Sequence, residues 1–195
     1  MNGRNEWCEK YIHVFDDLMI DNQTALVTWD HRGQGASSGE RASVKDYNHF
    51  AEDLNEVLAA TGLNHLPCHV IAHSMGALIS LVATGKKIIK PRSLCFSAPL
   101  LGIKHPPRLV RILLAKIAIG LGQGHTPYKP SFISKDDFSS NIITHSKSLY
   151  KAHRSSPYNV CAPTFNWILA SQKALDFVFD SKFIKSLCAP ITIIS

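Results

Sequence analysis

Ser74 lies in the sequence Ala-His-Ser-Met-Gly at positions 72–76, between apolar runs at residues 69–72 and 77–83. The first run is typical of a buried strand and the second of a helix. A serine between small residues at a strand-to-helix junction is the pattern of a serine hydrolase nucleophile. Bulky residues two positions away would clash in so tight a turn, and the helix directs its positive end at the reacting centre. The pattern predicts that Ser74 is a nucleophile, with an ordinary Ser/Gly turn as the alternative. The flanking residues are Ala72, His73, Met75 and Gly76.

Such a nucleophile needs two backbone N–H groups that bind the oxyanion of the tetrahedral intermediate. One comes from the residue after the serine, here Met75, and the other from the loop before the first helix. Residues 2–6, Asn-Gly-Arg-Asn-Glu, precede a predicted helix, and Gly3 allows the backbone to turn toward a ligand. Arg4 is the matching candidate, with an ordinary helix N-cap region as the alternative.

A glycine-rich loop at residues 30–41 suggests a different chemistry. Its glycines follow a predicted strand with the spacing of a dinucleotide-binding motif. That motif requires the helix to begin at the glycines, whereas polar residues 36–42 intervene here. The acidic residues about twenty positions on, Asp53 and Glu56, lie in a predicted helix rather than at a strand end. We therefore reject a nicotinamide-dependent oxidoreductase and expect no cofactor.

Strands and helices alternate along residues 1–100. Apolar spacing predicts helices over residues 6–19, 43–62 and 74–84. Short apolar runs predict strands over residues 25–29, 67–72 and 93–98. Ser43 and Asp46 match a capping box at the start of the second helix. This alternation predicts an α/β fold in which a mostly parallel sheet is flanked by helices.

The alternation stops at Pro99. Residues 101–165 hold several prolines and glycines and one basic amphipathic helix at 108–121. Helices at 165–171 and 175–183 and a buried strand at 189–195 then resume the pattern. We expect a core at residues 1–100, a mainly helical cap-like insertion at 101–165, and a return to the core at 166–195.

Composition restricts the classes further. The chain has 195 residues, 45% of them hydrophobic and 18% charged, which is typical of one globular domain. Its five cysteines are scattered without a C-x-x-C pair, which argues against a disulfide framework or a zinc site and favours a reducing compartment. No signal peptide is visible, and no apolar stretch is long enough to span a bilayer. We expect a cytoplasmic protein without a metal site.

The net charge of +6 is concentrated in the second half. Residues 1–100 carry nine Lys and Arg against eleven Asp and Glu, and residues 101–195 carry twelve against four. No nucleic-acid motif accompanies this charge. In the predicted helix 108–121, basic residues mix with Leu109, Ile112, Leu113 and Ile117. This favours peripheral contact with an anionic membrane at its inner face, with a solvated basic surface as the alternative.

Several segments in order resemble one family. They are residues 2–6, Asp-His-Arg-Gly-Gln-Gly-x-Ser-Ser-Gly-x-Arg at 30–41, the Ser74 segment, Ser-Ala-Pro at 97–99 and Pro-Thr-Phe-Asn-Trp at 163–167. Together they resemble the lysophospholipase and monoacylglycerol-lipase branch of the α/β-hydrolases, especially bacterial lysophospholipases. The resemblance implies a serine esterase acting on lipid-like esters, with Ser74 as nucleophile and Arg4 and Met75 as oxyanion donors.

The same resemblance assigns supporting roles. Asp30 and Arg32 would hold the 30–41 loop, and His73 would neighbour the nucleophile without being its base. Two residues depart from the family pattern: Ala72 stands where glycine is usual, and Asn2 where histidine is frequent. Both changes leave the backbone roles of Gly3 and Arg4 intact.

The larger departure concerns the rest of the catalytic triad. In this fold the acid and then the histidine follow the serine along the chain. The family's acid follows the strand that begins at Pro190, whereas the last histidine here is His153, in the insertion. The resemblance also implies strands before residue 2. We therefore expect a fragment of a longer hydrolase, inactive and poorly folded by itself. A non-catalytic remnant, a peptidase and an acyltransferase remain alternatives, and the head group, acyl chain and oligomeric state remain open.

Overall fold

The computed structural model describes residues 1–18, 21, 23–104, 108–128, 138–141, 144–160 and 162–194. Its elements, in chain order, are η1 (Cys8–Tyr11), α1 (Ile12–Asp17), α2 (Asn48–Ala60), β1 (His69–His73), α3 (Met75–Gly85), β2 (Ser93–Ser97), α4 (Arg108–Gly120), η2 (Phe138–Ser140), α5 (Lys147–Ser155), α6 (Phe165–Val178), α7 (Ser181–Ser186) and β3 (Ile191–Ile194).

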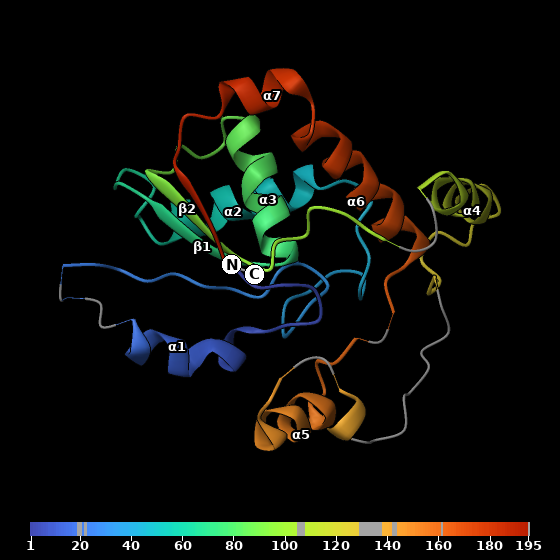
Figure 1. The fold of residues 1–195 in the computed structure, drawn as a ribbon, viewed down its shortest axis with the longest axis horizontal. Helices are drawn as coiled ribbons and strands as arrows, with labels where there is room; N and C mark the ends of the chain where they lie inside the picture. The colour runs from blue at the N-terminus through green and yellow to red at the C-terminus, as the bar shows by residue number, and fades with distance from the viewer. Residues whose placement is uncertain are drawn as a thin grey trace.

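The three strands form one parallel sheet in the order β1-β2-β3. Val70 pairs with Leu94, which in turn pairs with Ile191. Helix α3 joins β1 to β2 and packs on β1, while α2 and α6 pack against α3 (Figure 1). The predicted α/β architecture, a parallel sheet flanked by helices, is therefore confirmed.

The core lies between the sheet and α3. Val70, Ala72, Leu94 and Phe96 are buried on the sheet face toward this helix. Residues 75–83 of α3 are all buried, because the helix contacts the sheet, α2 and α6 at once. This burial on every side explains why the sequence there is apolar without a polar stripe.

The predicted strand over residues 25–29 is absent, although the segment is extended in Figure 1. Met1 occupies the row beside β1: its nitrogen donates to Ile71 O at 2.6 Å, and His73 N donates to Met1 O at 3.0 Å. Within the described part of the chain, the 25–29 segment bonds to this row through the Asn2 side chain: Asn2 Nδ2 donates to Trp29 O at 3.2 Å, and Thr28 Oγ1 donates to Asn2 Oδ1 at 3.3 Å. A side-chain contact cannot replace a backbone ladder, so this prediction was wrong.

Two helices begin at other residues than the sequence predicted. The helix expected from residue 6 begins as the 3₁₀ turn η1 and continues as α1; residue 19 lies outside the described residues. Helix α2 begins at Asn48, and the Asp46 carboxylate accepts the Asn48 N–H at 2.8 Å. Ser43 forms no cap, because it is buried together with Val44 where the chain packs against the core. The capping-box prediction was therefore wrong.

The boundary between the two helices predicted over residues 165–183 lies further along the chain than expected. Helix α6 runs unbroken through Gln172 to Val178, and α7 then starts with Asp180 as its N-cap, accepting from Lys182 N at 2.8 Å. The last predicted strand is present as β3 but is not buried. Ile193 is 54% exposed, because no described element covers it.

Candidate active site

Ser74 adopts a strained backbone conformation. Its φ is 48° and its ψ is −112°, a region that non-glycine residues rarely occupy. Its N–H donates to Ser97 O at the end of β2 (3.1 Å), and its carbonyl accepts from Leu100 N (3.0 Å) and Ala77 N (3.2 Å). Strand β2, the loop after it and α3 thus hold the half-buried serine in place at the C-terminal edge of the sheet.

The small residues around Ser74 are required for two separate reasons. Ala72 is 2% exposed and fills the core between β1 and α3. Gly76 is approached by backbone: an added Cβ would lie 2.6 Å from Met1 O and 2.7 Å from Asn2 O. Because Gly76 has no side chain, residues 1 and 2 can lie directly against the first turn of α3.

Arg4 and Met75, the two predicted oxyanion donors, contact the same tryptophan. Trp167 of α6 donates its Nε1–H to Met75 Sδ at 3.3 Å, and the Arg4 guanidinium carbon lies 5.7 Å from the Trp167 ring centroid. Met75 begins α3, where the first N–H groups have no acceptor within the helix. The structure therefore brings the 2–6 loop and the N-terminus of α3 together beside Ser74.

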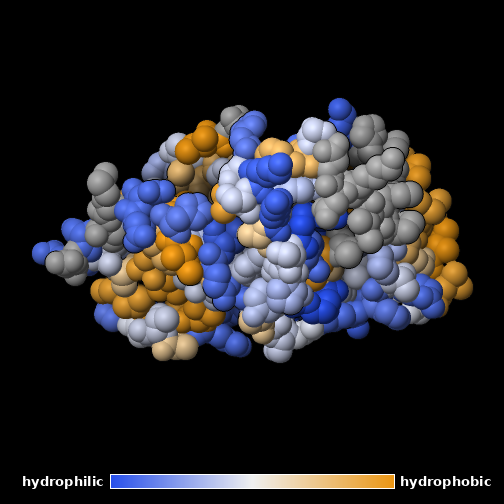
Figure 2. Space-filling model, turned by 90° about the horizontal axis from the view of Figure 1, so that it is seen from below, coloured by the Kyte–Doolittle hydropathy of each residue, from blue (hydrophilic) through white to orange (hydrophobic). Residues whose placement is uncertain are grey.

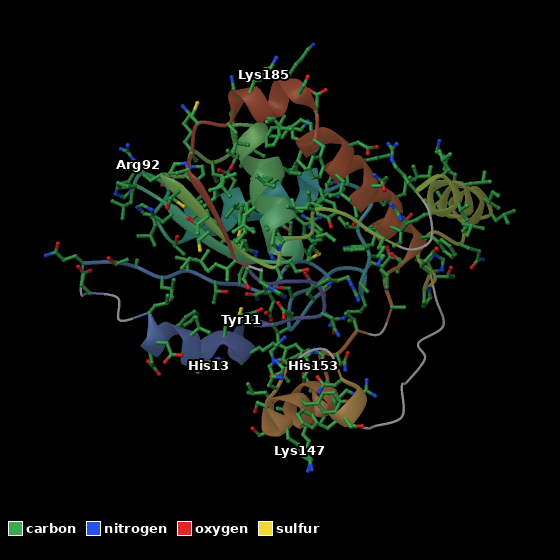
Figure 3. The ribbon with its side chains drawn as sticks, in the orientation of Figure 1. Tyr11, His13, Arg92, Lys147, His153 and Lys185 are labelled. Carbon is green, nitrogen blue, oxygen red and sulfur yellow. The ribbon has the colours of Figure 1, made fainter. Side chains whose placement is uncertain are left out.

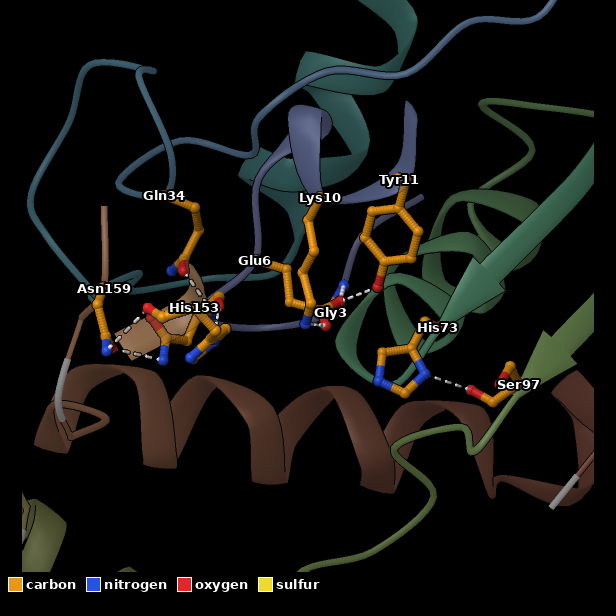
Figure 4. A network of polar contacts seen from close by, with 10 residues as sticks. Gly3, Glu6, Lys10, Tyr11, Gln34, His73, Ser97, His153 and Asn159 are labelled. Atoms are coloured by element: carbon orange, nitrogen blue, oxygen red, sulfur yellow. Dashed lines mark hydrogen bonds and ion pairs between the residues drawn. The ribbon is translucent and has the colours of Figure 1, made fainter. Parts of the chain in front are cut away.

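Glu6 is the polar centre of the 2–6 loop, a role that was not predicted from the sequence. Its buried carboxylate accepts the Gly3 N–H at 2.6 Å, forms an ion pair with Lys10 and accepts a hydrogen bond from Tyr11 (Figure 4). Burial raises the Glu6 pKa, but the charge of Lys10 and the two side-chain hydrogen bonds outweigh it and hold the pKa below its usual value. The spacing Glu6–Lys10, one helical turn apart, was the available signal.

Gly3 lies between that carboxylate and the end of β1. An added Cβ would lie 2.7 Å from Glu6 Oε2 and 2.9 Å from His73 Cδ2. The ring of His73 is itself fixed by a 3.0 Å contact between its Nδ1 and Ser97 O (Figure 4). His73 therefore packs against the 2–6 loop and bonds to the end of β2.

Asp30 organises the 30–41 loop. Its Oδ1 accepts from Cys8 N and its Oδ2 from Ala36 N, both at 2.7 Å. Gly35, with φ 47°, would place a Cβ only 2.0 Å from Asp30 Oδ2, so a side chain there would be strained and would displace the Asp30 carboxylate. Arg32 ties the loop to α2 through a bidentate ion pair with Asp53, with Nε to Oδ2 at 2.6 Å.

His31, in the same loop, is buried, and burial lowers its pKa to about 4. Its Nε2 contacts Asn2 O at 3.2 Å. This contact joins the 30–41 loop to the 2–6 loop rather than to Ser74.

No histidine of the described ranges bonds to the Ser74 hydroxyl. His31 contacts Asn2 O, His73 contacts Ser97 O, and His153 of α5 contacts Asn5 O at 3.3 Å. Among the residues that the structure describes, no group of His, Cys, Asp and Glu side chains could hold a metal ion. The arrangement can present a nucleophile and oxyanion donors, and it lacks a base within these residues.

Helix α4 exposes an apolar face. Leu109, Leu113, Ile117 and Leu121 follow one another at four-residue spacing and are 78%, 60%, 52% and 73% exposed. Figure 2 shows apolar residues at the end of the molecule where α4 lies. Ile117 and Leu121 of this face also line a groove of 510 Å³ between α4 and the start of α6. It is lined by Leu114, Ile117, Ala118, Leu121, Gln123, Thr126, Tyr128 and Phe165.

The basic residues of α4 are less available than their number suggests. Arg111 is buried and donates to Gln172 Oε1 at 2.5 Å, and Arg108 pairs with Asp176 at 2.8 Å. Lys116 is exposed. None of the helices in the described parts of the chain is both long and apolar enough to cross a bilayer.

Known proteins of one family resemble this chain in sequence. The family model described as Hydrolase_4, serine aminopeptidase S33, matches residues 1–195. A protein named "Probable lysophospholipase L2" from Haemophilus influenzae is 27% identical over 180 residues, covering 86% of this chain and 57% of the relative. Monoglyceride lipase of Rattus norvegicus is 26% identical over 162 residues, covering 80% and 50%.

A solved structure has the same fold. A soluble variant of monoglyceride lipase from Saccharomyces cerevisiae, in complex with a substrate analog, superposes with a TM-score of 0.70 at 22% identity, covering 99% of this chain and 65% of that one. The chain spans about half the length of the curated relatives it matches.

Proposed function

The chain belongs to the Hydrolase_4 family of serine aminopeptidase S33 type, and on this basis we propose that the complete protein is a serine hydrolase of lipid-like carboxylic esters. The relatives named as lysophospholipase and monoglyceride lipase support this substrate class. Ser74 is the proposed nucleophile, and the N–H groups of Arg4 and Met75 are the proposed oxyanion donors.

The proposed reaction has two stages. Ser74 Oγ attacks the ester carbonyl carbon while a histidine base of the complete protein takes the hydroxyl proton. The negative charge that develops on the carbonyl oxygen is bound by the two N–H groups. The intermediate collapses to an acyl-enzyme, and the protonated histidine gives its proton to the leaving alcohol. Water then attacks the acyl-enzyme, which releases the fatty acid and restores Ser74.

The strained conformation of Ser74 is the observation that carries this proposal. A φ of 48° costs free energy that an ordinary turn serine would avoid. The surrounding structure maintains it between β1 and α3, where the N-terminal end of the helix favours developing negative charge. Asp30, Arg32 and His73 keep supporting roles in this scheme, because their polar groups bond to neighbouring segments.

We propose that the insertion, residues 101–165, acts as a cap whose α4 face rests on lipid. The apolar residues of this face and Lys116 together support contact with an anionic membrane, although Arg111 does not contribute. The proposed location is the inner face of the cytoplasmic membrane, a compartment that suits the free Cys8, Cys68, Cys95 and Cys188. Nucleic acid and metal have no part in this scheme.

The central test uses the complete protein. A fluorophosphonate probe should label it, and Ser74→Ala should abolish both the labelling and the hydrolysis of lysophospholipid or monoacylglycerol. Ser80→Ala, which removes a buried hydroxyl bonded to Gly76 O within α3, is the matched control and should remain labelled. Hydrolysis of peptides but not esters would favour a peptidase, and labelling that survives Ser74→Ala would refute the proposal.

The membrane proposal is tested with vesicles. The complete protein should bind vesicles that contain anionic lipid, and Leu113→Asp should weaken this binding at least tenfold. Leu66→Asp, at an exposed leucine outside the insertion, is the control. Binding that responds neither to anionic lipid nor to the α4 substitution would refute membrane contact through this face.

A further inference from the structure

Asn5 lies where the 2–6 loop, the 30–41 loop and the insertion meet. Its backbone N–H donates to Gln34 Oε1 at 2.8 Å, and its carbonyl oxygen contacts His153 Nε2 at 3.3 Å. Its side-chain Oδ1 accepts the Val160 N–H at 2.6 Å, and its Nδ2 donates to Asn159 Oδ1 at 2.9 Å. All four polar groups of this one residue are therefore used, three of them by the insertion.

The backbone of Asn5 is in the left-handed region. Its φ is 62°, a conformation that disfavours residues with a Cβ and that asparagine tolerates better than most. Asn5 directly follows Arg4, so this turn helps to fix the Arg4–Asn5 peptide, which is attached to the same Cα as the Arg4 N–H. The contacts with Gln34 and the insertion hold that unfavourable conformation in place.

Aromatic packing strengthens the same junction. The Trp7 ring stacks on His153 with centroids 5.3 Å apart and lies 6.1 Å from the Tyr158 ring. Arg41 of the 30–41 loop donates to Tyr158 O at 3.3 Å. Figure 3 shows His153 on the side of α5 that faces the N-terminal segment, and Figure 4 shows Gln34, His153 and Asn159 converging there. Residues 153–160 are thus docked on the loop that carries Arg4.

We propose that Asn5 is a positioning residue that makes the orientation of the Arg4 N–H depend on the docking of residues 153–160. This inference rests on the proposed function and adds a coupling between the insertion and the oxyanion donor. When the insertion is docked, the two side-chain bonds of Asn5 fix the loop. When it is not docked, the left-handed turn loses these partners and the donor leaves its position.

The decisive variant is Asn5→Gly in the complete protein. Glycine keeps the left-handed backbone and removes only the bonds to Asn159 and Val160, so a loss cannot be attributed to backbone strain. We expect kcat to fall about 10- to 100-fold with little change in KM, because the geometry of the transition state changes rather than substrate binding. Amide exchange at Val160 should accelerate. Asn64→Gly, in an exposed turn, is the matched control.

A double-mutant cycle tests the coupling itself. Asn159→Ala breaks the bond from the insertion side without altering the 2–6 loop, and it should lower kcat in the same way. If the effect passes through this bond, the double variant with Asn5→Gly should be no slower than Asn5→Gly alone. Multiplicative losses in the double variant, or exchange at Val160 that Asn5→Gly leaves unchanged, would overturn the inference.

The outcomes separate this inference from the proposed function. Ester hydrolysis that depends on Ser74 but is unaffected by Asn5→Gly overturns the positioning role alone. Hydrolysis that persists in Ser74→Ala overturns the proposed function and the role of Asn5 with it.

Discussion

Gly76→Ala is the substitution for which the structure makes the sharpest prediction. An added Cβ would lie 2.6 Å from Met1 O and 2.7 Å from Asn2 O, and both neighbours are backbone atoms that cannot rotate away. An ordinary contact needs roughly 0.7 Å more. Because α3 is packed on three sides, we expect the displacement to fall on residues 1–4, which include the proposed oxyanion donor Arg4.

The magnitude of the effect follows from this displacement. A shift approaching 1 Å in a positioned group lowers kcat by up to about 100-fold, and loss of an oxyanion donor lowers it by about 100- to 1000-fold. We expect a loss of about 100-fold in kcat with KM nearly unchanged. Stability should fall by no more than about 2 kcal/mol, because overpacking costs about 1–3 kcal/mol while alanine favours the helix by about 1 kcal/mol.

The assay compares two glycine-to-alanine variants of the complete protein. Gly120, at the end of α4, has no atom within 4 Å of an added Cβ, so Gly120→Ala tests the same chemical change without the overlap. It should keep full esterase activity and gain a few tenths of a kcal/mol in urea unfolding. Wild-type kcat in a folded Gly76→Ala protein would refute the idea that this close approach positions the 2–6 loop.

Three further predictions concern the side chains around the site. Glu6→Gln should lower the free energy of unfolding by about 1–3 kcal/mol at pH 7, since it removes the charge that binds Lys10. Because the folded pKa of Glu6 is lowered, this difference should disappear as the pH falls through that pKa. His31 has a folded pKa of about 4 against about 6.5 unfolded, so the unfolded chain binds the proton first. Wild-type stability should therefore fall by about 3 kcal/mol between pH 6.5 and 4, and His31→Gln should lack this component in pH-dependent urea unfolding. A double-mutant cycle of Arg32→Ala and Asp53→Ala should give a coupling of about 0.5–1 kcal/mol that decreases in high salt, because the pair is partly exposed.

Each of these predictions can fail on its own. Equal stability of wild type and Glu6→Gln at pH 7 would mean that the carboxylate does not hold the loop. An identical pH dependence in His31→Gln would mean that the histidine is not buried in its neutral form. A coupling above about 2 kcal/mol would show that Arg32 and Asp53 are better shielded from water than their exposure indicates.

The elements that the sequence predicted well are those buried by their immediate neighbours. The strands at β1 and β2 and the helix α3 appear within two residues of their predicted bounds. Their apolar runs are long relative to the elements, and Pro99 ends the run after β2. Burial by nearby segments leaves a signal in the local sequence, because most residues of each run are apolar.

The strand predicted at residues 25–29 shows the opposite case. Its residues favour a strand, yet a strand also needs a backbone partner, and the hydrogen bonds that the described residues give this segment run to the Asn2 side chain. Which strands pair depends on the whole fold, so the strand propensity of a short segment does not predict its pairing. The same holds for β3, whose isoleucines suggest burial although Ile193 is exposed.

The positions in the candidate site that restrict the residue type could be predicted from the sequence, whereas the long-range hydrogen bonds that join the loops of the site could not. Ser74, Gly76 and Gly3 stand out because tight turns and close approaches restrict the residue type. The role of Asn5 depends on residues 159 and 160, which lie far along the chain. No short-range pattern records such a contact, and Asn5 alone resembles any loop asparagine.

The position of the insertion in the chain path has an evolutionary consequence. Leu94 of β2 pairs with Ile191 of β3, and the whole of residues 101–165 lies in the connection between them. Doubling the length of such a connection costs only about 0.6 kcal/mol in closure entropy. This connection can therefore be lengthened, shortened or exchanged while the pairing of β2 with β3 stays the same. For the proposed cap, substrate preference and folding can in this way diverge under separate selection, and the proposed junction at Asn5 is where each new segment must fit.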